Sequence, residues 1–370
     1  AILIYFILIN LSLFTLFFIS FRSVKRFIKF IFKLDYIKIN ESQLTPPISI
    51  LIPAFNEELT AVKTIRSILS VNYNEFEIIV INDGSSDNTL SVLIEEFELF
   101  PCTIPFKKTI ETKKIFGTYK STRYVNIVVI DKENGGKADA LNAGINISKY
   151  PLFSSIDADC ILDPLALLRL VKPFVDYPQE TIAAGGIVCV SNGCEIKNGK
   201  VERIGLPNNM LAMMQVIEYF RAFLAGRAGL SLIKSILIIS GAFGLFKKQA
   251  VIDIGGYSNL TDAEDCEIIL RLHRFMRERK KKYRILFVPD PVCWTEVPEK
   301  LKSFNAQRAR WHRGLTQAIW LHKDMILNPR YGIVGLFSMP WHIVFEMIAP
   351  AIELLGLIFI FLAWYFEILN

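Results

Sequence analysis

Two aspartates, Asp157 and Asp159, follow an apolar run near the middle of the chain. The run predicts a short buried strand, so both carboxylates come just after a strand end. Carboxylates spaced in this way are well placed to hold a hard divalent cation, Mg²⁺ or Mn²⁺, which would neutralise charge on a leaving diphosphate. A lone Asp-x-Asp pair is common, so its weight depends on the turns that accompany it.

A glycine-rich turn stands before this pair, in the sequence NGGKADALN from Asn134 to Asn142. Glycines ahead of a helix let the backbone approach a phosphate, and the N-terminus of the helix favours anions. The turn lacks the GxxxxGK[ST] spacing, which excludes a Walker A site.

Two more turns follow predicted strands earlier in the chain. The first offers backbone groups to a base or a ribose through four residues, Pro53, Ala54, Asn56 and Glu57. The second, NDGSSD, contains Asp83, whose carboxylate can accept from a uracil N–H or a ribose hydroxyl. The same six residues also satisfy a turn with a helix N-cap at Ser86 or Asp87, and for Asp87 we favour the cap.

Strands that alternate with helices must position these turns. Apolar, β-rich runs predict strands at Ile48–Phe55, Phe76–Asn82, Val125–Asp131, Leu152–Ile156, Ile182–Ser191, Gly241–Phe246 and Arg284–Pro289. Helical patterns cover Glu57–Ser70, Asn88–Phe97, Lys137–Ser148, Pro164–Val175, Asn209–Ala225, Asp262–Arg279 and Leu301–Met325. The alternation favours an α/β fold with a parallel sheet covered on both faces and ligands at the carboxyl ends of its strands. The basic stretch Pro101–Arg123 interrupts it, and we expect a surface excursion there.

The two ends of the chain are apolar. Of the 370 residues, 52% are hydrophobic and 28 are Phe. The uncharged run Ala1–Phe21 is long enough for one helix across a hydrocarbon layer of roughly 30 Å. A signal peptide fits less well, because no basic region precedes the run and no small-residue cleavage site follows it. Five basic residues come next, which places the following domain in the cytoplasm by the positive-inside rule: Arg22, Lys25, Arg26, Lys29 and Lys33.

The C-terminal end contains two apolar segments. Gly332–Ala349 suits an oblique span or an interfacial position, and Ala351–Leu369 is the better span. The earlier segment Pro207–Leu232 suits either a core helix or an interfacial one. The chain starts at Ala1 rather than Met and stops at Asn370 beside an apolar segment, so we expect further sequence at both ends.

Charge and cysteine usage exclude some classes of function. The net charge is +6, with much of the excess beside the first apolar run, which indicates contact with membrane lipids and no nucleic acid. The six cysteines and four histidines show no CxxC spacing and no Cys/His metal pattern. We expect reduced thiols in the core of a cytosolic domain.

Two later motifs complete an ordered series: Asp262–Asp265 (DAED), which opens a helix, and Gln307–Trp311 (QRARW). Together with PAFNE, NDGSSD, NGGKADALN and DAD, the series resembles the family 2 glycosyltransferases of GT-A fold, from about Ile48 to Gly314. QRARW is similar to the QxxRW motif of the processive membrane synthases of cellulose, hyaluronan, chitin and poly-N-acetylglucosamine. The resemblance implies a Rossmann-like mixed, mainly parallel sheet with flanking helices, plus transmembrane or interfacial helices at both ends.

The resemblance also implies roles for individual residues. The UDP-sugar would be bound by Pro53, Ala54, Asn56, Glu57, Asp83, Lys137, Asp157 and Arg310. Among these, Asp83 would contact the uridine, Lys137 the pyrophosphate, and Arg310 the departing diphosphate. The cation would be held by Asp159 with Asp157. Asp265, beside Glu264, would be the catalytic base. The acceptor-binding site would be lined by Gln307, Trp311, Ser240 and Gly241.

The chemistry of these residue types supports a single displacement. One base, a cation and an arginine suit inversion at the sugar carbon, and no second catalytic carboxylate of the kind a hydrolase needs is evident. Asp265 has an alternative role as an acidic residue that complements a helix dipole. The chain departs from the family pattern at Ala263, where Thr is expected, although Thr261 is nearby. No counterpart of the gating loop of cellulose synthase follows Trp311.

We therefore expect a transmembrane helix at residues 1–21, a basic linker at 22–47, a cytoplasmic GT-A domain at 48–314, an interfacial helix at 315–331 and a membrane region at 332–370. The expected function is metal-dependent, inverting transfer from UDP-N-acetylglucosamine or UDP-glucose to a glycan at the cell membrane. Processive synthesis and partner subunits for export are left open. The alternatives are single-sugar transfer to a lipid-linked acceptor and a non-catalytic nucleotide-sugar-binding subunit. We expect a multi-pass membrane protein.

Overall fold

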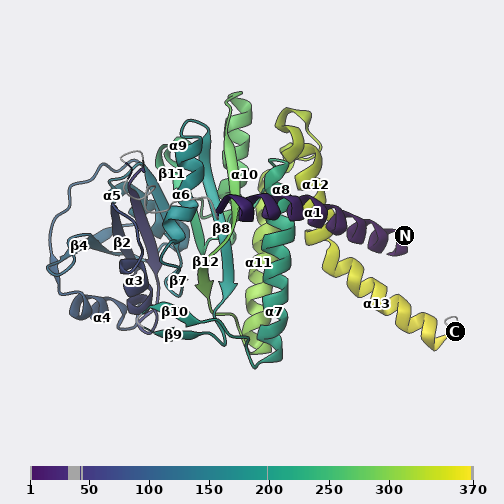
Figure 1. Cartoon of the computed structure of the whole chain (residues 1–370), viewed down its shortest axis with the longest axis horizontal. Helices are drawn as coiled ribbons and strands as arrows, with labels where there is room; N and C mark the ends of the chain where they lie inside the picture. Colours follow the sequence, from purple (N-terminus) through teal and green to yellow (C-terminus); the bar gives the residue numbers. More distant parts are fainter. Residues whose placement is uncertain (1, 32–41, 43–44, 198, 368–370) are drawn as a thin grey trace.

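The computed structural model describes residues 2–31, 42, 45–197 and 199–367. Its centre is a ten-stranded sheet (Figure 1). The strands lie in the order β3 (Leu99–Pro101), β4 (Ile115–Ser121), β5 (Ile127–Lys132), β2 (Phe76–Asp83), β1 (Ile48–Ala54), β6 (Leu152–Ile156), β11 (Phe243–Lys247), β8 (Thr181–Val190), β12 (Arg284–Thr295) and β7 (Ile161–Leu162). A separate hairpin joins β9 (Glu195–Lys197) to β10 (Lys200–Arg203).

The sheet is mixed, as expected for the fold class. Strands β5, β2, β1 and β6 run parallel, and so do β8 and β12. Strand β11 lies antiparallel between β6 and β8, and both edges of the sheet are antiparallel. The expectation of a mainly parallel sheet thus holds for the half that carries the first four motifs, where the strands share one carboxyl edge.

Helices connect the strands close to the predicted bounds. They are α3 (Ala61–Leu69), α4 (Thr89–Glu96), α5 (Lys137–Ile147) and α6 (Ala166–Asp176), and a further short helix, α9 (Lys248–Asp253), was not predicted. Helix α5 packs on β1 and β2, and every one of its residues after Lys137 is buried. Its start is therefore fixed rigidly at the carboxyl edge of the sheet.

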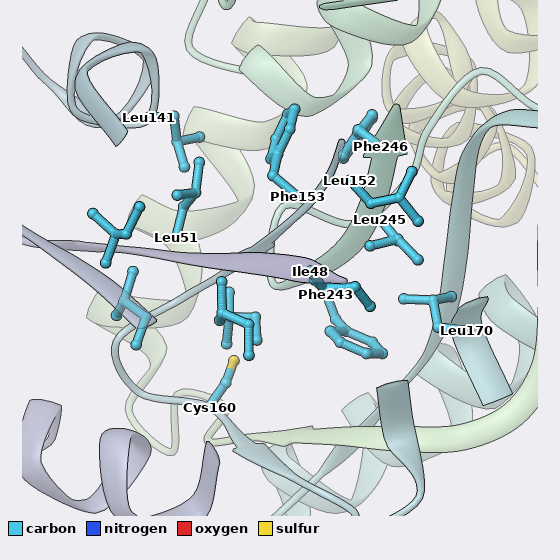
Figure 2. Packing of buried hydrophobic residues seen from close by; sticks show 14 of the residues in the cluster. Ile48, Leu51, Leu141, Leu152, Phe153, Cys160, Leu170, Phe243, Leu245 and Phe246 are labelled. Carbon is cyan, nitrogen blue, oxygen red and sulfur yellow. The ribbon is translucent and has the colours of Figure 1, made fainter. Parts of the chain in front are cut away.

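The core is formed by the strands and the helices that cover them. Ile48 and Leu51 of β1 are fully buried among residues of the neighbouring strands (Figure 2). Phe153 of β6 stacks on Phe246 of β11, with ring centroids 5.4 Å apart, and Tyr257 meets both rings edge-on. This apolar packing fixes the strand ends from which the motifs project.

A second group of helices lies on the side of the sheet toward the chain termini (Figure 1). Helix α7 (Met210–Phe220) continues through a π-helical turn, η1 (Arg221–Arg227), into α8 (Ala228–Leu232). Helices α10 (Glu264–Glu278) and α11 (Leu301–Leu321) complete the group, and an ion pair between Arg308 and Glu218 joins α11 to α7. Helix α11 is continuous, so the QxxRW residues share one helix with the start of the segment 315–331.

The N-terminal helix α1 (Ile2–Ile31) packs against η1 and α8, where the Ser20 hydroxyl donates to the Leu224 carbonyl. The C-terminal part contains η2 (Lys323–Met325), η3 (Pro329–Tyr331), η4 (Val334–Ser338), α12 (Met339–His342), η5 (Ile343–Met347) and α13 (Ala349–Tyr365). The Trp341 Nε1–H donates to Ser12 Oγ across 3.4 Å, which ties this part to α1. Helices α1 and α13 project from the same side of the molecule (Figure 1).

Within the described residues, one helix is long and apolar enough to cross a membrane, Leu3–Arg22. A second candidate exists only if the bent pair Val334–Met347 and Ala349–Tyr365, which meet at 42°, is counted as one span. Helix α1 carries the first basic residues of the flank, while Lys33 and most of the expected linker lie outside the described residues. The last residues of the expected span Ala351–Leu369 also lie outside them.

The segment Pro101–Arg123 is more ordered than a surface excursion. It contributes β4, which pairs antiparallel with β3 on one side and β5 on the other. The sequence IFGTYKS alternates weakly because the strand is near the sheet edge and its side chains are only partly covered. The expectation of an irregular excursion was therefore wrong for residues 115–121.

Candidate active site

Lys137 joins two motifs that are far apart in the sequence. It is the first residue of α5, and its Nζ lies 2.6 Å from Asp157 Oδ1, just beyond β6. The same nitrogen lies 3.0 Å from Glu264 Oε1, at the start of α10. Burial lowers the pKa of Lys137, but the charges of Asp157 and Glu264 outweigh it and hold that pKa well above its usual value. Lys137 is therefore a fixed positive charge between the DAD and DAED motifs.

The DAD carboxylates are held at higher pKa values than free aspartates. Burial raises the pKa of Asp157, and neighbouring Asp159 raises it further against the opposing effect of Lys137. Burial also raises the pKa of Asp159, with a contribution from Glu57. A cation bound between the two carboxylates would reduce their mutual repulsion.

The donor set around Asp157 and Asp159 fits a hard metal ion. The side chains offer oxygen, which suits Mg²⁺ or Mn²⁺. Within the described part of the chain, no group of three or more His, Cys, Asp or Glu side chains is arranged to hold a metal. Asp157 and Asp159 would supply part of a coordination shell, and the remaining positions would suit the oxygens of a diphosphate and water.

Asp265 lies one residue beyond Glu264, and its carboxylate is held by two backbone donors. Oδ2 accepts from the Gly241 N–H at 3.1 Å, and Oδ1 accepts from the Cys266 N–H at 2.8 Å. Burial and the adjacent charge of Glu264 raise the pKa of Asp265 to about 6, against the effects of Lys137 and Arg227. A pKa in this range suits a general base near neutral pH.

Gly241 sits where a side chain has no room. A Cβ at this position would lie 2.8 Å from Lys137 Nζ and 3.2 Å from Glu264 Oε1. Its neighbour Ser240 is half-buried, and the Ser240 carbonyl accepts from the Phe243 N–H that begins β11. The structure thus places Gly241, with Ser240 next to it in the chain, beside the DAED motif.

Asp83, expected to contact uridine, is engaged by the protein itself. Its carboxylate accepts from the backbone N–H groups of Gly135 at 3.0 Å and Gly136 at 2.8 Å, and it forms an ion pair with Lys132. Lys132 Nζ also lies 2.8 Å from Asp139 Oδ1, and both carboxylates are buried. Asp83 therefore shapes the glycine turn directly.

Lys132 and Asp139 were not among the residues singled out from the sequence. Lys132 is fully buried although it is a charged residue at the end of β5, after a continuous apolar run. The sequence could have pointed to Lys132, because a lysine at a strand end next to a glycine turn is unusual. The reason for its burial appears only in the structure, where Lys132 pairs with Asp83 across the parallel strands β5 and β2.

The PAFNE turn is joined to the NDGSSD turn through Asn56. Asn56 has a φ of 58°, and its Oδ1 accepts from the N–H groups of Ser86 at 2.8 Å and Asp87 at 3.3 Å. Asp87 in turn accepts from the Thr89 N–H at 3.0 Å, at the first residue of α4. Asp87 therefore accepts from the N–H of the first residue of α4, but the N-cap position is Asn88, so the predicted N-cap at Asp87 was one residue too early.

The other residues of the PAFNE turn lie in β1 or just after it. Pro53 and Ala54 are the last residues of β1, opposite Ile81 and Asn82 of β2. The Glu57 N–H donates to Thr89 Oγ1 across 2.8 Å. All four residues of this turn that were expected to bind the UDP-sugar therefore lie at the carboxyl edge of the sheet.

The QxxRW residues lie on α11, beside α7. Trp311 is 39% exposed, and the Arg308 guanidinium lies 4.7 Å from its ring centroid. Gln307 Oε1 is buried and makes no hydrogen bond within the described residues. Arg310 is exposed, and its charge contributes to lowering the pKa of Glu264. Helix α11 therefore brings the charge of Arg310 to the DAED motif, and it also carries the Trp311 ring and the unbonded Gln307 Oε1.

The departure at Ala263 has a structural basis. A Cβ on Gly314 of α11 would lie 2.6 Å from Ala263 Cβ and 2.6 Å from its backbone nitrogen. Helix α11 and the segment before α10 are therefore in direct contact at these two residues, with no space between them. Thr261 Oγ1 is buried and makes no hydrogen bond within the described residues, so a free hydroxyl does lie near the motif.

Comparisons with known proteins identify the family of the chain. Residues 49–255 match the model of glycosyl transferase family 2, and residues 153–369 match that of glycosyl transferase family group 2. The chain is 33% identical over 275 residues to a poly-β-1,6-N-acetyl-D-glucosamine synthase of Staphylococcus epidermidis, covering 74% of this chain and 56% of the relative. It is 31% identical over 268 residues to the synthase of that name from Staphylococcus aureus strain COL, covering 72% of this chain and 54% of the relative.

The chain spans about half the length of these curated relatives. Among solved structures, the mannosyltransferase PcManGT from Pyrobaculum calidifontis, in complex with GDP-Man and Mn²⁺, aligns with a TM-score of 0.57 at 17% identity. That alignment covers 95% of this chain and 92% of the mannosyltransferase, and at this identity it shows a shared GT-A fold. The chain is an enzyme that belongs to glycosyltransferase family 2.

Proposed function

We propose that this glycosyltransferase transfers a sugar from a UDP-sugar to a glycan acceptor, with inversion and with Mg²⁺ or Mn²⁺. The observation that carries the proposal is the ion-pair bridge from Lys137 to Asp157 and Glu264, which brings the diphosphate side and the base side into one site. UDP-N-acetylglucosamine is the favoured donor, supported by the names of the Staphylococcus relatives. UDP-glucose is the second choice.

The residues divide the reaction between them. Asp265 accepts the proton of the acceptor hydroxyl, whose oxygen forms a bond to the anomeric carbon. The bond from that carbon to the diphosphate oxygen breaks on the opposite face, which inverts the configuration. Lys137 and Arg310 receive the departing UDP, since both are cations beside Glu264. Asp157 and Asp159 would hold the metal, which supplies charge neutralisation to the diphosphate.

Membrane placement follows from the two ends of the chain. We place α1 across the membrane and the sheet domain on its cytoplasmic side, because basic residues follow the apolar run. Helices α7 and α11 then lie near the membrane surface, on the side from which α1 and α13 project (Figure 1). A multi-pass topology requires that the bent pair ending in α13 also spans.

The experiment is a UDP-release assay on the purified chain with a panel of UDP-sugars and Mg²⁺ or Mn²⁺, followed by mass spectrometry of the products. We expect release with one donor and a ladder of glycan products. A single added sugar on a lipid-linked acceptor would favour that alternative. Tight UDP binding without release from any donor would replace the proposal with a non-catalytic binding subunit.

The base assignment has its own test. Asp265→Asn preserves shape and removes the base, so we expect turnover to fall by about 10²–10⁴-fold while UDP binding is retained. Asp253→Asn, an exposed aspartate on α9, is the matched control and should turn over normally. Normal turnover by Asp265→Asn would overturn the assignment.

A further inference from the structure

Arg308 is the second residue of the QRARW motif, and the proposed reaction does not use it. Its guanidinium donates twice to one carboxylate on α7, from Nη1 to Glu218 Oε1 at 2.5 Å and from Nη2 to Glu218 Oε2 at 2.7 Å. Two parallel bonds of this kind fix the plane of the guanidinium as well as its position. The two side chains are 25% and 37% exposed, so the pair is better shielded from solvent than a fully exposed ion pair.

The fixed guanidinium lies against two aromatic rings of α11. Its carbon is 4.8 Å from the ring centroid of Phe304, four residues earlier, and 4.7 Å from that of Trp311, three residues later. Residues at these spacings share one side of a helix. A cation over the face of a ring is attracted to it, most strongly when the ring is Trp. The ring of Trp311 is therefore held against a cation that cannot easily move.

Part of Trp311 remains open to a ligand. The residue is 39% exposed even though the guanidinium lies over its ring. A side chain that is already fixed loses little conformational freedom when a ligand covers it. The large apolar ring of an indole suits the C–H face of a pyranose, so a glycan is the class of ligand that this surface fits.

Contacts further along α11 place Trp311 near the motif that contains the proposed base. A Cβ on Gly314 would lie 2.6 Å from Ala263 Cβ, and the Asp262 N–H donates to Gln317 Oε1 across 2.8 Å. Gly314 follows Trp311 by three residues, which is less than one turn and about 4.5 Å along the axis of a helix. Trp311 therefore belongs to the stretch of α11 that adjoins the DAED motif.

The ion pair is not the only link between α7 and α11. Gln215 Nε2 on α7 donates to the carbonyl of Pro298, just before α11, across 2.9 Å. This bond joins the two helices independently of Glu218. What the ion pair adds is a constraint on the guanidinium, and through it on the ring of Trp311.

We propose that Glu218 and Arg308 are positioning residues, which hold the ring of Trp311 at the edge of the site so that a sugar ring of the acceptor stacks on it. Both residues act through Trp311 and not on the reacting atoms. The inference rests on the proposed function, and it gives α7 a part in binding the acceptor.

The first readout is the environment of the ring. The chain contains five Trp residues, so 5-fluorotryptophan labels five sites for ¹⁹F NMR, and the signal that is missing in Trp311→Phe belongs to Trp311. We expect this signal to shift in Glu218→Gln and in Arg308→Lys, because lysine keeps the charge without the planar fork. The remaining signals should hold. Glu96→Gln, which alters the ion pair between Arg66 on α3 and α4, is the matched control and should leave every signal in place.

The second readout is binding to the purified full chain, measured by calorimetry with two probes, UDP with Mn²⁺ and a β-1,6-linked N-acetylglucosamine tetramer. Trp311→Ala should weaken tetramer binding by about 10-fold or more, because the ring is lost. Glu218→Gln should weaken it by about 5-fold, because the ring remains but must be ordered on binding. UDP affinity should stay within about twofold of wild type in both, and Glu96→Gln should match wild type for both probes. In kinetic assays, the acceptor KM should rise in Glu218→Gln while the donor KM holds.

The reversed pair, Glu218→Arg with Arg308→Glu, separates positioning of the ring from attachment of the helices. It restores opposite charges on α7 and α11, but it places a carboxylate instead of a guanidinium against Trp311. Tetramer binding should therefore stay weak. Recovery of wild-type affinity would show that the pair only joins the helices, and would overturn the inference.

Three other results would also overturn it: an unchanged Trp311 signal or tetramer affinity in Glu218→Gln, absence of tetramer binding to the wild-type chain, or an equal loss of UDP affinity, which would indicate a general disturbance of the site. UDP binding also reports that each variant is folded. Failure of the proposed function is a separate result, since it appears as wild-type chain that releases no UDP from any donor.

Discussion

The backbone N–H of Gly241 donates to Asp265 Oδ2 across 3.1 Å, and the same glycine leaves no space for a side chain beside Lys137. The loop before β11 therefore touches both the base and the ion-pair bridge. A contact this close couples the position of one backbone segment to two functional side chains.

Gly241→Ala should reduce turnover strongly, because its Cβ would lie 2.8 Å from Lys137 Nζ and must displace the lysine or the loop. We expect a loss of at least 10-fold in kcat/KM, measured by UDP release. Gly117→Ala is the control, since its Cβ would make only an ordinary contact at 3.5 Å. Equal activity of the two variants would contradict the close approach.

Asp265 should give the acid limb of the pH–rate profile. A base with a pKa of about 6 is protonated below that pH, so kcat/KM should rise with pH through about 6 and then level off. The profile is measured with saturating metal between pH 5 and pH 8. A rate that stays constant across this range would rule out Asp265 as the titrating base.

The raised pKa of Asp265 also predicts how the stability of the fold depends on pH. Because the folded-state pKa of Asp265 lies above its ordinary value of 3.8, its contribution to stability is full below pH 3.8 and is lost as pH rises through about 6. At pH 7.5 the burial of this charge costs up to about 3 kcal/mol, which Asp265→Asn removes. Thermal unfolding should therefore show the variant to be more stable than wild type at pH 7.5, with little difference at pH 4.

Lys132→Met should destabilise the domain by about 3–5 kcal/mol, because it leaves the carboxylates of Asp83 and Asp139 buried without their shared cation. The loss is measured as a fall in the unfolding temperature, together with weaker UDP binding. Lys120→Met, on the exposed surface of β4, provides the comparison and should change neither. Wild-type stability in Lys132→Met would show that the two carboxylates do not depend on it.

Divalent cations should be required for turnover. EDTA should abolish UDP release, and Mg²⁺ or Mn²⁺ should restore it. Asp159→Asn should raise the metal concentration needed for half-maximal activity at least 10-fold, because a carboxylate ligand becomes a weaker neutral one. Asp176→Asn, at an exposed ion pair on α6, should retain the wild-type requirement. Full activity in EDTA would exclude the metal.

Much of the sheet could be predicted because its buried strands are continuous apolar runs. Residues 152–156 were predicted with the bounds that β6 has in the structure. Strand β4 was missed because its side chains, in the strand next to the sheet edge, are only partly covered and so lack that pattern. Strand β12 continues to Thr295, well past the predicted end at Pro289, because register shifts in its pairing with β8 accommodate the prolines.

The site was predictable in its residue types and less so in its contacts. The sequence placed Lys137, Asp157 and Asp265 at strand and helix ends, and the structure brings their motifs together. It did not reveal that Asp83 is paired with Lys132, because that contact depends on the register of β2 against β5.

The bridge formed by Lys137 has a consequence for the order of binding. One lysine sits between Asp157 and Glu264, with Asp159 and Asp265 close by, so acidic groups outnumber this cation. A bare nucleoside diphosphate, itself an anion, would be repelled from this surface. Under the proposed function, the donor would therefore enter already complexed with its metal ion, which offsets part of its negative charge.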